Sequence, residues 1–510
     1  MGRGLRQTTA MGRRHAIASA LAIIALVGLF AASGWFAEKA VADGSGGSEP
    51  SPDIVEPAKA DRSGRWIALG GGSLPELNQV SIEQDLALAR DVLGADRGHV
   101  LFAGGPDSRS VQVLDPAPRG DALMMELAGI FSPRSGRDAH YRKTTLTPAG
   151  PATVESALQA IQDELARPDA KGGLLLYLAG HGEQGEAPRN NLMRLWGQGA
   201  LTATAMAETL DAAPASRQVR MVATTCFSGG FAEIVFVGAD SAKGAAKGDR
   251  CGLFASPWDL EASGCDPDPD RRKHQGYGVH FLNALQGRAR DGKPLPLEQL
   301  DLDKDGVISL LEAHTRARIA SASWDVPTTT SERWLRYVGL VAGDQKPVAL
   351  PEEDAVIQAM ATRLGISGSL AEAQSLQSAV NTAVEVALAD LADSRDSEDL
   401  AFRALAADLL TRWPVIDDPW HPDFGPTVRQ HRAAITEFLA MSPRFARYRE
   451  AITAVDRLDS FVSSARVKAA PVERLVRAHQ NKLLASRLAA VGGTEWAVYE
   501  QLLACERSAP

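Results

Sequence analysis

The chain has 510 residues, of which 45% are hydrophobic and 23% charged. That length is enough for about three domains with buried cores, and the ordinary composition excludes a largely disordered chain or a membrane protein with several spans. The net charge is −9 at pH 7; the first 42 residues carry +4, so the rest carries −13. Because phosphate binding needs a basic face, nucleic acid is not expected as a partner.

Residues 1–42 are predicted to direct export. Four arginines precede an apolar run from Ala16 to Ala37, and Ala40-Val41-Ala42 has the small-x-small pattern of a signal peptidase site. The run is also long enough to cross a bilayer once, so the segment is either a signal peptide or an N-terminal membrane anchor. In both cases the body is expected to be extracytoplasmic, either periplasmic or secreted. Residues 43–61, rich in Gly, Ser and Pro, are predicted to be a flexible linker.

From residue 62 to 345, short apolar runs alternate with amphipathic helical patterns. The predicted strands are 66–69, 100–103, 174–178, 219–223 and 253–256, and the predicted helices include 82–93, 154–165, 202–210 and 280–285. This alternation predicts an α/β domain with a doubly wound, mostly parallel sheet and flanking helices. After about residue 345 the periodicity is helical only, which predicts an all-helical C-terminal domain over 350–510.

Two residues with catalytic chemistry follow neighbouring predicted strands. His181 and Gly182 come directly after the strand LLLYLAG, and Cys226 follows the next strand, 45 residues after His181. Carboxyl ends of parallel strands meet at one edge of a sheet, so both side chains can reach one crevice. A cysteine thiolate can act as nucleophile with histidine as general base and acid. The N–H groups of Gly182 and Cys226 could hold an oxyanion.

An apolar strand ending in His-Gly, followed by a second ending in Cys-x-Ser-Gly, resembles the caspase-like (clan CD) cysteine peptidases, and most of all the legumain-like family. The resemblance extends from Trp66 to about Gly339. It implies a caspase-like fold and a cysteine endopeptidase acting on protein or peptide substrates through a thioester acyl-enzyme. By resemblance, Cys226 is the nucleophile and His181 the acid and base. The helical C-terminal domain occupies the position of the legumain pro-region, which implies a zymogen in which it covers the active site; a module that binds a regulator is the alternative.

Departures from the family concern the substrate pocket. Thr224 stands two positions before Cys226, where legumain-like enzymes and metacaspases carry an acidic residue, and the loop after the first strand contains Glu76 but no arginine. No preference for the residue before the scissile bond is therefore transferred. Asn78 falls where the family places an asparagine that orients the histidine, although a turn role fits equally. Further candidates for the pocket wall, or for solvated loop positions, are Asp249, Asp259 and Glu261.

The stretch DLDKDGVISLLE, residues 301–312, matches the twelve-residue EF-hand calcium loop. Gly306 would permit its sharp turn. The predicted Ca²⁺ ligands are the carboxylates of Asp301, Asp303, Asp305 and Glu312, the carbonyl of Val307, and a water held by Ser309. Such closely spaced acids repel one another without a cation. A structural or permissive calcium site joining the two domains is expected, with an acidic surface turn as the alternative.

The four cysteines lie at positions 226, 251, 265 and 505. Cys226 is expected to stay free because an attacking thiol cannot be paired. Cys251 and Cys265, 14 residues apart in a loop-rich stretch, are predicted to form a disulfide. Cys505 has no evident partner.

The loop with Lys243, Lys247 and Arg250 is expected to be a processing site, as in caspases by resemblance. Two other functions remain open at this point. The same dyad could act as a transamidase or peptide ligase, in which an amine resolves the thioester. Alternatively, the chain is a catalytically silent, calcium-stabilised binding scaffold.

Overall fold

The structure is a computed structural model that describes residues 64–510, except 116–119, 132–138, 168–171, 215 and 420. The predicted export segment and the linker lie outside the described residues. The described residues belong to one compact unit. Among the helices that the structure describes, none combines the length and the apolar character needed to cross a bilayer.

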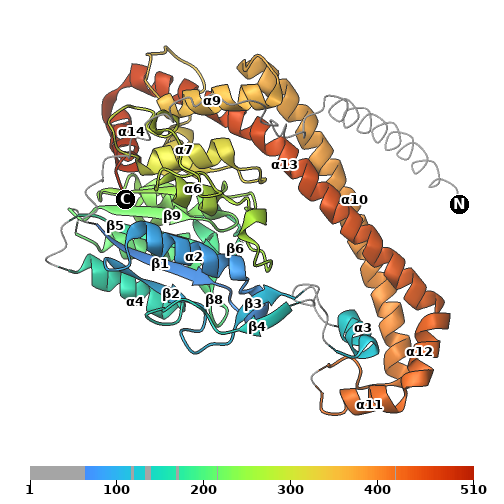
Figure 1. The fold of residues 1–510 in the computed structure, drawn as a ribbon. Coiled ribbons are helices and arrows are strands. Elements are labelled where there is room, and N and C mark those ends of the chain that lie inside the picture. Colours follow the sequence, from blue (N-terminus) through green and yellow to red (C-terminus); the bar gives the residue numbers. More distant parts are fainter. Residues whose placement is uncertain (1–63, 116–119, 132–138, 168–171, 215, 420) are drawn as a thin grey trace, which may run out of the picture. The chain divides into compact units, whose positions relative to one another are not determined.

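A six-stranded sheet with the order β11-β10-β9-β5-β1-β2 forms the centre of the α/β domain (Figure 1). Its strands are β1 (Arg65–Gly71), β2 (Gly98–Phe102), β5 (Leu174–Gly180), β9 (Val219–Ala223), β10 (Arg250–Phe254) and β11 (Thr328–Thr329). All neighbours pair in parallel except β11, which is antiparallel to β10. The predicted α/β class with a mostly parallel sheet is confirmed. Every residue of β5 is buried, as expected for an apolar strand covered on both faces.

Helices cover both faces of this sheet. Alternation along β1 directs Trp66 and Ala68 into one core and Ile67 and Leu69 into the other. The first core is closed by α2 (Val80–Leu93), α6 (Tyr277–Ala284) and α7 (Leu310–Ala320), and the second by α4 (Val154–Leu165) and α5 (Ala203–Asp211). Thr202 caps α5 by accepting a hydrogen bond from the Ala205 N–H.

Small sheets at the edges of the domain were not anticipated from the sequence. β3 (Val111–Leu114) and β4 (Ala139–Arg142) form a hairpin, and β6 (Gly182–Glu183), β7 (Leu192–Leu195) and β8 (Gly199–Thr202) form an antiparallel sheet. Strands of two to four residues carry too little periodicity to be recognised. Helix α3 (Ala122–Phe131) lies between β3 and β4 in the chain.

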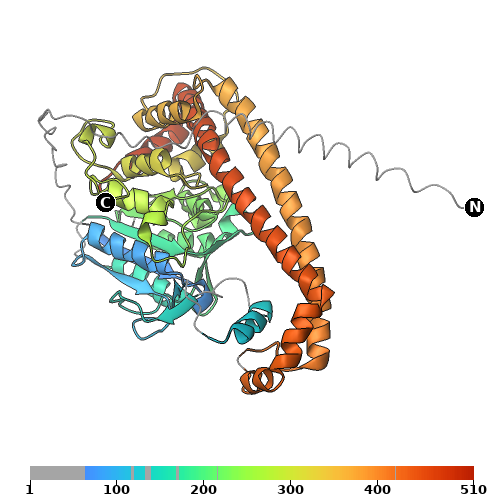
Figure 2. The same cartoon turned by 45° about the vertical axis from the view of Figure 1, so that its right-hand side comes forward.

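Helices α8 (Thr330–Val338) and α9 (Pro351–Leu364) lead into the C-terminal region. We call the next four helices the helical arm: α10 (Leu370–Arg412), α11 (Phe424–Gln430), α12 (Arg432–Met441) and α13 (Pro443–Val491). α10 and α13 lie side by side (Figures 1 and 2) and bury apolar residues between them, among them Leu391 and Val462. The chain ends with α14 (Gly493–Glu506).

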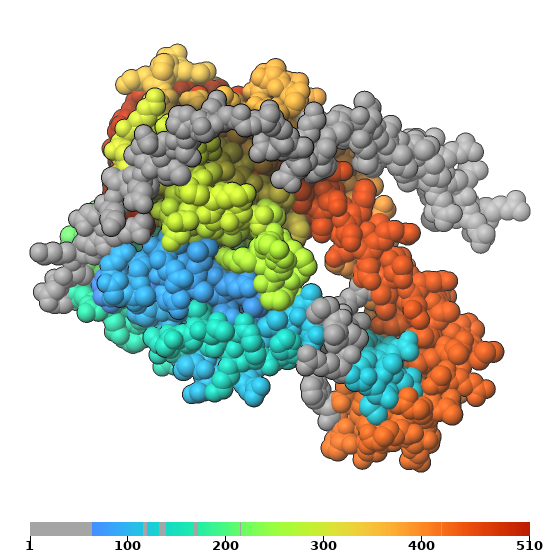
Figure 3. Space-filling view, in the orientation of Figure 1, coloured from blue at the N-terminus to red at the C-terminus, as the bar shows by residue number. Residues whose placement is uncertain are grey.

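The helical arm contacts the α/β domain at both of its ends. Where α10 meets α11 and α12, it packs against α3, whose Leu127 and Ile130 join the same apolar cluster as Leu405 and Trp413. Figure 3 shows α3 in cyan against these orange helices. At the other end, Leu475 of α13 packs with α9, and α14 packs with α8 and β10. The long helices are therefore anchored twice.

The predicted disulfide between Cys251 and Cys265 is wrong, because Cys251 is bonded to Cys505. Packing of α14 on the apolar cluster of α8 and β10 brings Cys505 to the buried Cys251. Cys265 is exposed and free, and its Sγ lies 3.6 Å from the carbonyl oxygen of Gly180. Cys226 is free, as predicted.

Candidate active site

Cys226 lies just beyond the carboxyl end of β9. The N–H of Thr224 bonds to the Leu178 carbonyl and extends the pairing of β9 with β5. Phe227 then adopts a left-handed conformation, with φ of 57°, and turns the chain into a short 3-10 helix over Ser228–Val235. The Sγ of Cys226 contacts Ala262, at 3.3 Å from its carbonyl oxygen and 3.4 Å from its nitrogen. The thiol is thus held against the loop that follows β10.

His181 lies directly after β5, the strand that neighbours β9. Its Nε2 is 2.9 Å from the carbonyl oxygen of Leu77 and 2.9 Å from Oε1 of Gln79. Because a carbonyl oxygen only accepts, Nε2 carries the proton in the neutral ring, which leaves Nδ1 as its basic nitrogen. The β1–α2 loop therefore fixes both the tautomer and the orientation of the imidazole.

Gln79, and not Asn78, is the side chain that contacts His181. Asn78 is fully buried and bonds to the N–H of Gly72 and to Oγ of Ser110, each at 3.1 Å, so the turn role holds for it. Nothing in the sequence distinguishes Gln79 from other loop residues.

Gly182 brings the two strand ends into contact. A Cβ at this position would lie 2.0 Å from the carbonyl oxygen of Cys226 and 3.1 Å from Oγ1 of Thr225. Only a glycine permits this approach of the two backbones. Of the side-chain hydrogen bonds in the described part of the chain, none links His181 to Cys226. The two groups lie at the ends of adjacent strands without a direct bond.

Electrostatics favour the neutral forms of both groups. Burial raises the pKa of the Cys226 thiol; the Ala262 N–H opposes this, and the negative charges of Glu261 and Asp325 raise that pKa further. Burial lowers the pKa of His181, against smaller opposing effects of the Leu77 carbonyl and Glu183. At neutral pH the resting site therefore holds a thiol and a neutral imidazole instead of an ion pair.

Asn191, which is fully buried, joins three loops around the site. Its Nδ2 donates to the carbonyl oxygens of Phe227 at 2.9 Å and Trp258 at 2.6 Å. Its Oδ1 accepts from the N–H of Gly185 at 2.9 Å. A single amide thus ties the segments after β6, β9 and β10 together, and it is another residue that sequence reasoning missed.

A small pocket of about 20 Å³ lies near the carboxyl ends of β5 and β9 and is lined in part by Gly180 and Thr224, whereas Cys226 and His181 do not line it. Its acidic lining residue is Asp85 of α2, whose carboxylate pairs with Arg271 at 2.6 Å. The candidate acids from the sequence lie elsewhere. Asp249 pairs with Arg220 and Glu261 with Arg466, and Asp259 does not line the pocket. The remaining lining residues are Ile82, Ala179, Ser263, Gly264, Cys265, His274, Gly276, Gly278 and Val279.

In the loop that resembles an EF-hand, three of the predicted ligands come together. One carboxylate oxygen from each of Asp301, Asp303 and Asp305 lies within 4.8 Å of the others. Gly306 has a φ of +85°, as its sharp turn requires. Oxygen donors in this arrangement fit a hard cation such as Ca²⁺. Burial, together with the neighbouring acids, raises the pKa of Asp303.

Two of the other predicted ligands, Ser309 and Glu312, are bonded to each other at the start of α7. Glu312 accepts hydrogen bonds from the N–H groups of Leu302 and Ser309 at 2.6 and 2.9 Å. Ser309 caps α7 and forms a capping box with Glu312. The Val307 N–H bonds to Asp305 at 2.8 Å, inside the loop. Glu312 therefore lies outside the cluster of three aspartates.

The predicted processing loop is only partly accessible. Lys243 and Lys247 are exposed, but Arg250 is the first residue of β10 and is buried. Its guanidinium bonds to the Ile234 carbonyl at 2.6 Å and to Asp211 at 2.7 Å. A protease cannot reach the bond after Arg250 in the folded chain, which corrects the expectation for that residue.

No protein-family model matches the chain, and no curated protein matches it. Among solved structures, the chain is similar to the X-ray structure of a secreted C11 cysteine protease from Bacteroides thetaiotaomicron in complex with an irreversible peptide inhibitor. The two are 16% identical, with a TM-score of 0.22. The match covers 44% of this chain and 53% of that chain, so it spans about half of the similar protein.

Proposed function

We propose that this protein is a cysteine endopeptidase in which Cys226 and His181 hydrolyse peptide bonds. The observation that carries the proposal is the meeting of their strand ends, since the Cβ position of Gly182 lies 2.0 Å from the Cys226 carbonyl oxygen. A free thiol and an imidazole with a basic Nδ1 thereby end adjacent strands, near a small pocket.

The proposed reaction begins from the neutral pair. Nδ1 of His181 takes the thiol proton as Sγ of Cys226 attacks the substrate carbonyl carbon. The N–H groups of Gly182 and Cys226 stabilise the oxyanion. The tetrahedral intermediate collapses with cleavage of the C–N bond, and His181 protonates the leaving amine. Water then hydrolyses the thioester, with His181 again acting as base.

We propose further that residues 301–312 bind Ca²⁺ and that the enzyme works outside the cytosol. The approach of three aspartates within 4.8 Å supports the calcium site. The apolar, arginine-preceded segment within residues 1–42 supports export. Calcium would supply charge neutralisation among these carboxylates and takes no part in the peptide cleavage.

The test is cleavage of a mixture of fluorogenic peptides that differ in the residue before the scissile bond, assayed with calcium and with chelator. Cys226→Ala should abolish turnover, whereas Cys265→Ser, the change at the free thiol that lines the pocket, should retain kcat and alter at most KM. Turnover that survives in Cys226→Ala would refute the proposal. Product masses in the presence of an added amine separate hydrolysis from transamidation.

A further inference from the structure

Arg474 of α13 is among the largest fully buried side chains of the protein. Its guanidinium makes five hydrogen bonds, all to main-chain carbonyl oxygens: two to Asp325 and one each to Arg318, Ser321 and Ser323, at 2.6 to 3.1 Å. An arginine has five N–H donors, so every one of them is used. Burying a charged group without hydrogen-bond partners is costly, so this complete set of hydrogen bonds indicates that the contact stabilises the fold. The helical arm thereby holds the segment that links α7 to β11.

The carboxylate of Asp325, at the end of that segment, is fully buried. It accepts hydrogen bonds from the N–H and Oγ of Ser263 at 2.6 and 3.0 Å, and from the N–H of Tyr277 at 2.8 Å. Ser263 belongs to the loop after β10, and Tyr277 is the first residue of α6. One carboxylate therefore fixes both segments, and Ser263 also lines the small pocket near the carboxyl ends of β5 and β9.

The residue before Ser263 is Ala262, whose main chain contacts Sγ of Cys226 at 3.3 and 3.4 Å. A continuous series of direct contacts thus runs from Arg474 through Asp325 and the Ser263 loop to the thiol. Eight residues earlier on α13, Arg466 pairs with Glu261 of the same loop. The helical arm therefore holds this loop at two points, about two helical turns apart.

We propose that Arg474 is a positioning residue of the active site, and that the helical arm supports the loop that contacts Cys226 instead of acting as a removable cover. This inference rests on the proposed peptidase function. The bond between Cys251 and Cys505 agrees with a retained arm, because it ties α14, which follows the arm, to β10 of the central sheet. Cutting the chain within the arm would leave α14 attached.

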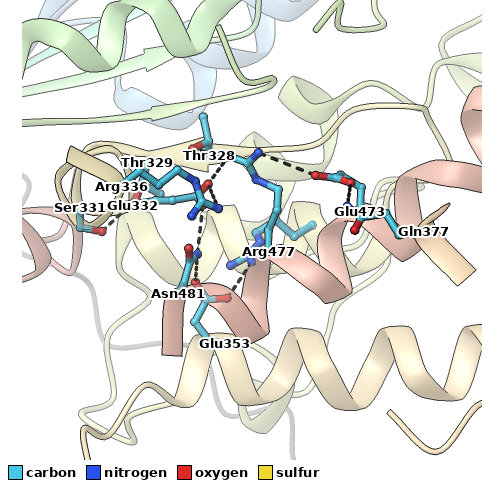
Figure 4. Close-up of polar contacts among 11 residues, drawn as sticks. Thr328, Thr329, Ser331, Glu332, Arg336, Glu353, Gln377, Glu473, Arg477 and Asn481 are labelled. Carbon is cyan, nitrogen blue, oxygen red and sulfur yellow. Dashed lines mark hydrogen bonds and ion pairs between the residues drawn. The ribbon is translucent and has the colours of Figure 1, made fainter. Parts of the chain in front are cut away.

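Arg477 offers a matched control one turn further along α13. It pairs with Glu332 and lies 3.4 Å from Oγ1 of Thr328, within a polar network around α8 and α9 (Figure 4). Like Arg474, it joins the arm to the α/β domain through a guanidinium. None of its described contacts reaches Ser263, Ala262 or the other residues of that loop.

The experiment compares Arg474→Lys with Arg477→Lys in the full chain. A lysine keeps the charge but has three donors for the five bonds. Four quantities are measured: KM and kcat on the best fluorogenic peptide, the rate of iodoacetamide labelling of Cys226 by mass spectrometry, and the thermal midpoint. Labelling is measured in a Cys265→Ser background, because Cys265 lies in the same loop and lines the same pocket as Ser263.

For Arg474→Lys we expect kcat/KM to fall by about 10- to 100-fold, mainly through KM, while Cys226 labelling accelerates relative to the chain that keeps Arg474. Arg477→Lys should lower the thermal midpoint by a similar amount. It should leave kcat/KM and the rate of Cys226 labelling within about 2-fold of the wild type. Equal effects of the two variants would overturn the proposal. If Arg474→Lys does not fold, Ser263→Ala, which removes one donor to Asp325, must reproduce the rise in KM, and an unchanged KM would overturn the proposal.

Labelling also separates the two hypotheses, since it needs no substrate. If the wild-type chain cleaves no peptide, the peptidase proposal fails on its own. The labelling rate of Cys226 would still test whether Arg474 holds the loop against Cys226, and a rate unchanged in Arg474→Lys would refute that positioning role.

Discussion

At the scale of single residues, the resting chemistry of the site is set by burial more than by pairing. Desolvation raises the pKa of Cys226 and lowers that of His181. A thiol in this state reacts slowly until it loses its proton to a base. Catalysis therefore depends on transfer of the Cys226 proton to His181 when substrate is bound. Reactivity of Cys226 toward a small alkylating agent should therefore rise steeply only above neutral pH.

The charge of Glu261 is one cause of that raised pKa. Glu261→Gln removes a negative charge, which favours the thiolate, so the labelling profile of Cys226 should move to lower pH and the rate at pH 7 should rise about 2-fold. Arg466→Gln leaves Glu261 without its partner and should move the midpoint of the profile to higher pH, a change that is separate from any effect of the lost loop contact on the labelling rate. Iodoacetamide labelling between pH 6 and 10, in a Cys265→Ser background, measures both. Shifts in the same direction would contradict this account.

Gly182 is a steric requirement of the site. The Cβ of Gly182→Ala would lie 2.0 Å from the Cys226 carbonyl oxygen, so the two strand ends must separate. We expect about 100-fold lower peptide turnover in a chain that still folds, as judged by circular dichroism and steady-state kinetics. Gly248→Ala, with nothing within 4 Å of its Cβ position, is the control. Equal activity of both variants would show that this contact is dispensable.

At the scale of elements, the disulfide joins a sheet strand to the last helix. Cys251 and Cys505 are 254 residues apart, and closing so long a loop restricts the unfolded chain. Cys505→Ser should therefore lower the free energy of unfolding by about 3 to 5 kcal/mol. Denaturant titration checks this value, with Cys265→Ser as the unaffected control. Finding Cys251 linked to Cys265 in non-reducing peptide maps would refute the observed pairing.

The sequence predicts those strands and helices whose own residues form an apolar run or an amphipathic repeat. The apolar runs of β1, β5 and β9, and the helices α4 and α5, lie within one or two residues of the expected ranges. The adjacency of β5 and β9, on which the site depends, also follows from the parallel alternation. Contacts between distant segments do not follow, because Gln79 acts on a side chain, and Asn191 and Arg474 on main-chain carbonyls, that are far away in sequence. The Cys251–Cys505 pairing was missed for the same reason.

At the scale of the whole molecule, the loop that resembles an EF-hand lies where the α/β domain meets the end of the chain. The N–H of Leu310, just before Glu312, bonds to the carbonyl oxygen of Ser508 at 3.0 Å. The neighbouring Arg507 makes two bonds to Glu352 of α9, at 2.7 and 2.8 Å. A cation in this loop would therefore stabilise the α/β domain and the C-terminal helices together.

Calcium should accordingly raise the midpoint of one shared unfolding transition, followed by circular dichroism and tryptophan fluorescence. A concentration 100 times the Kd corresponds to about 2.7 kcal/mol of added stability. Asp303→Asn should remove this response, because it takes one carboxylate from the cluster of three and leaves the capping box at the start of α7 intact. Glu298→Gln makes the same charge change on an exposed residue just before the loop and should retain the response.

If chelator and calcium give the wild-type chain the same midpoint, the loop is an acidic turn. If calcium shifts only one of the two signals, the loop stabilises one part of the chain, and the coupling through Ser508 and Arg507 is refuted.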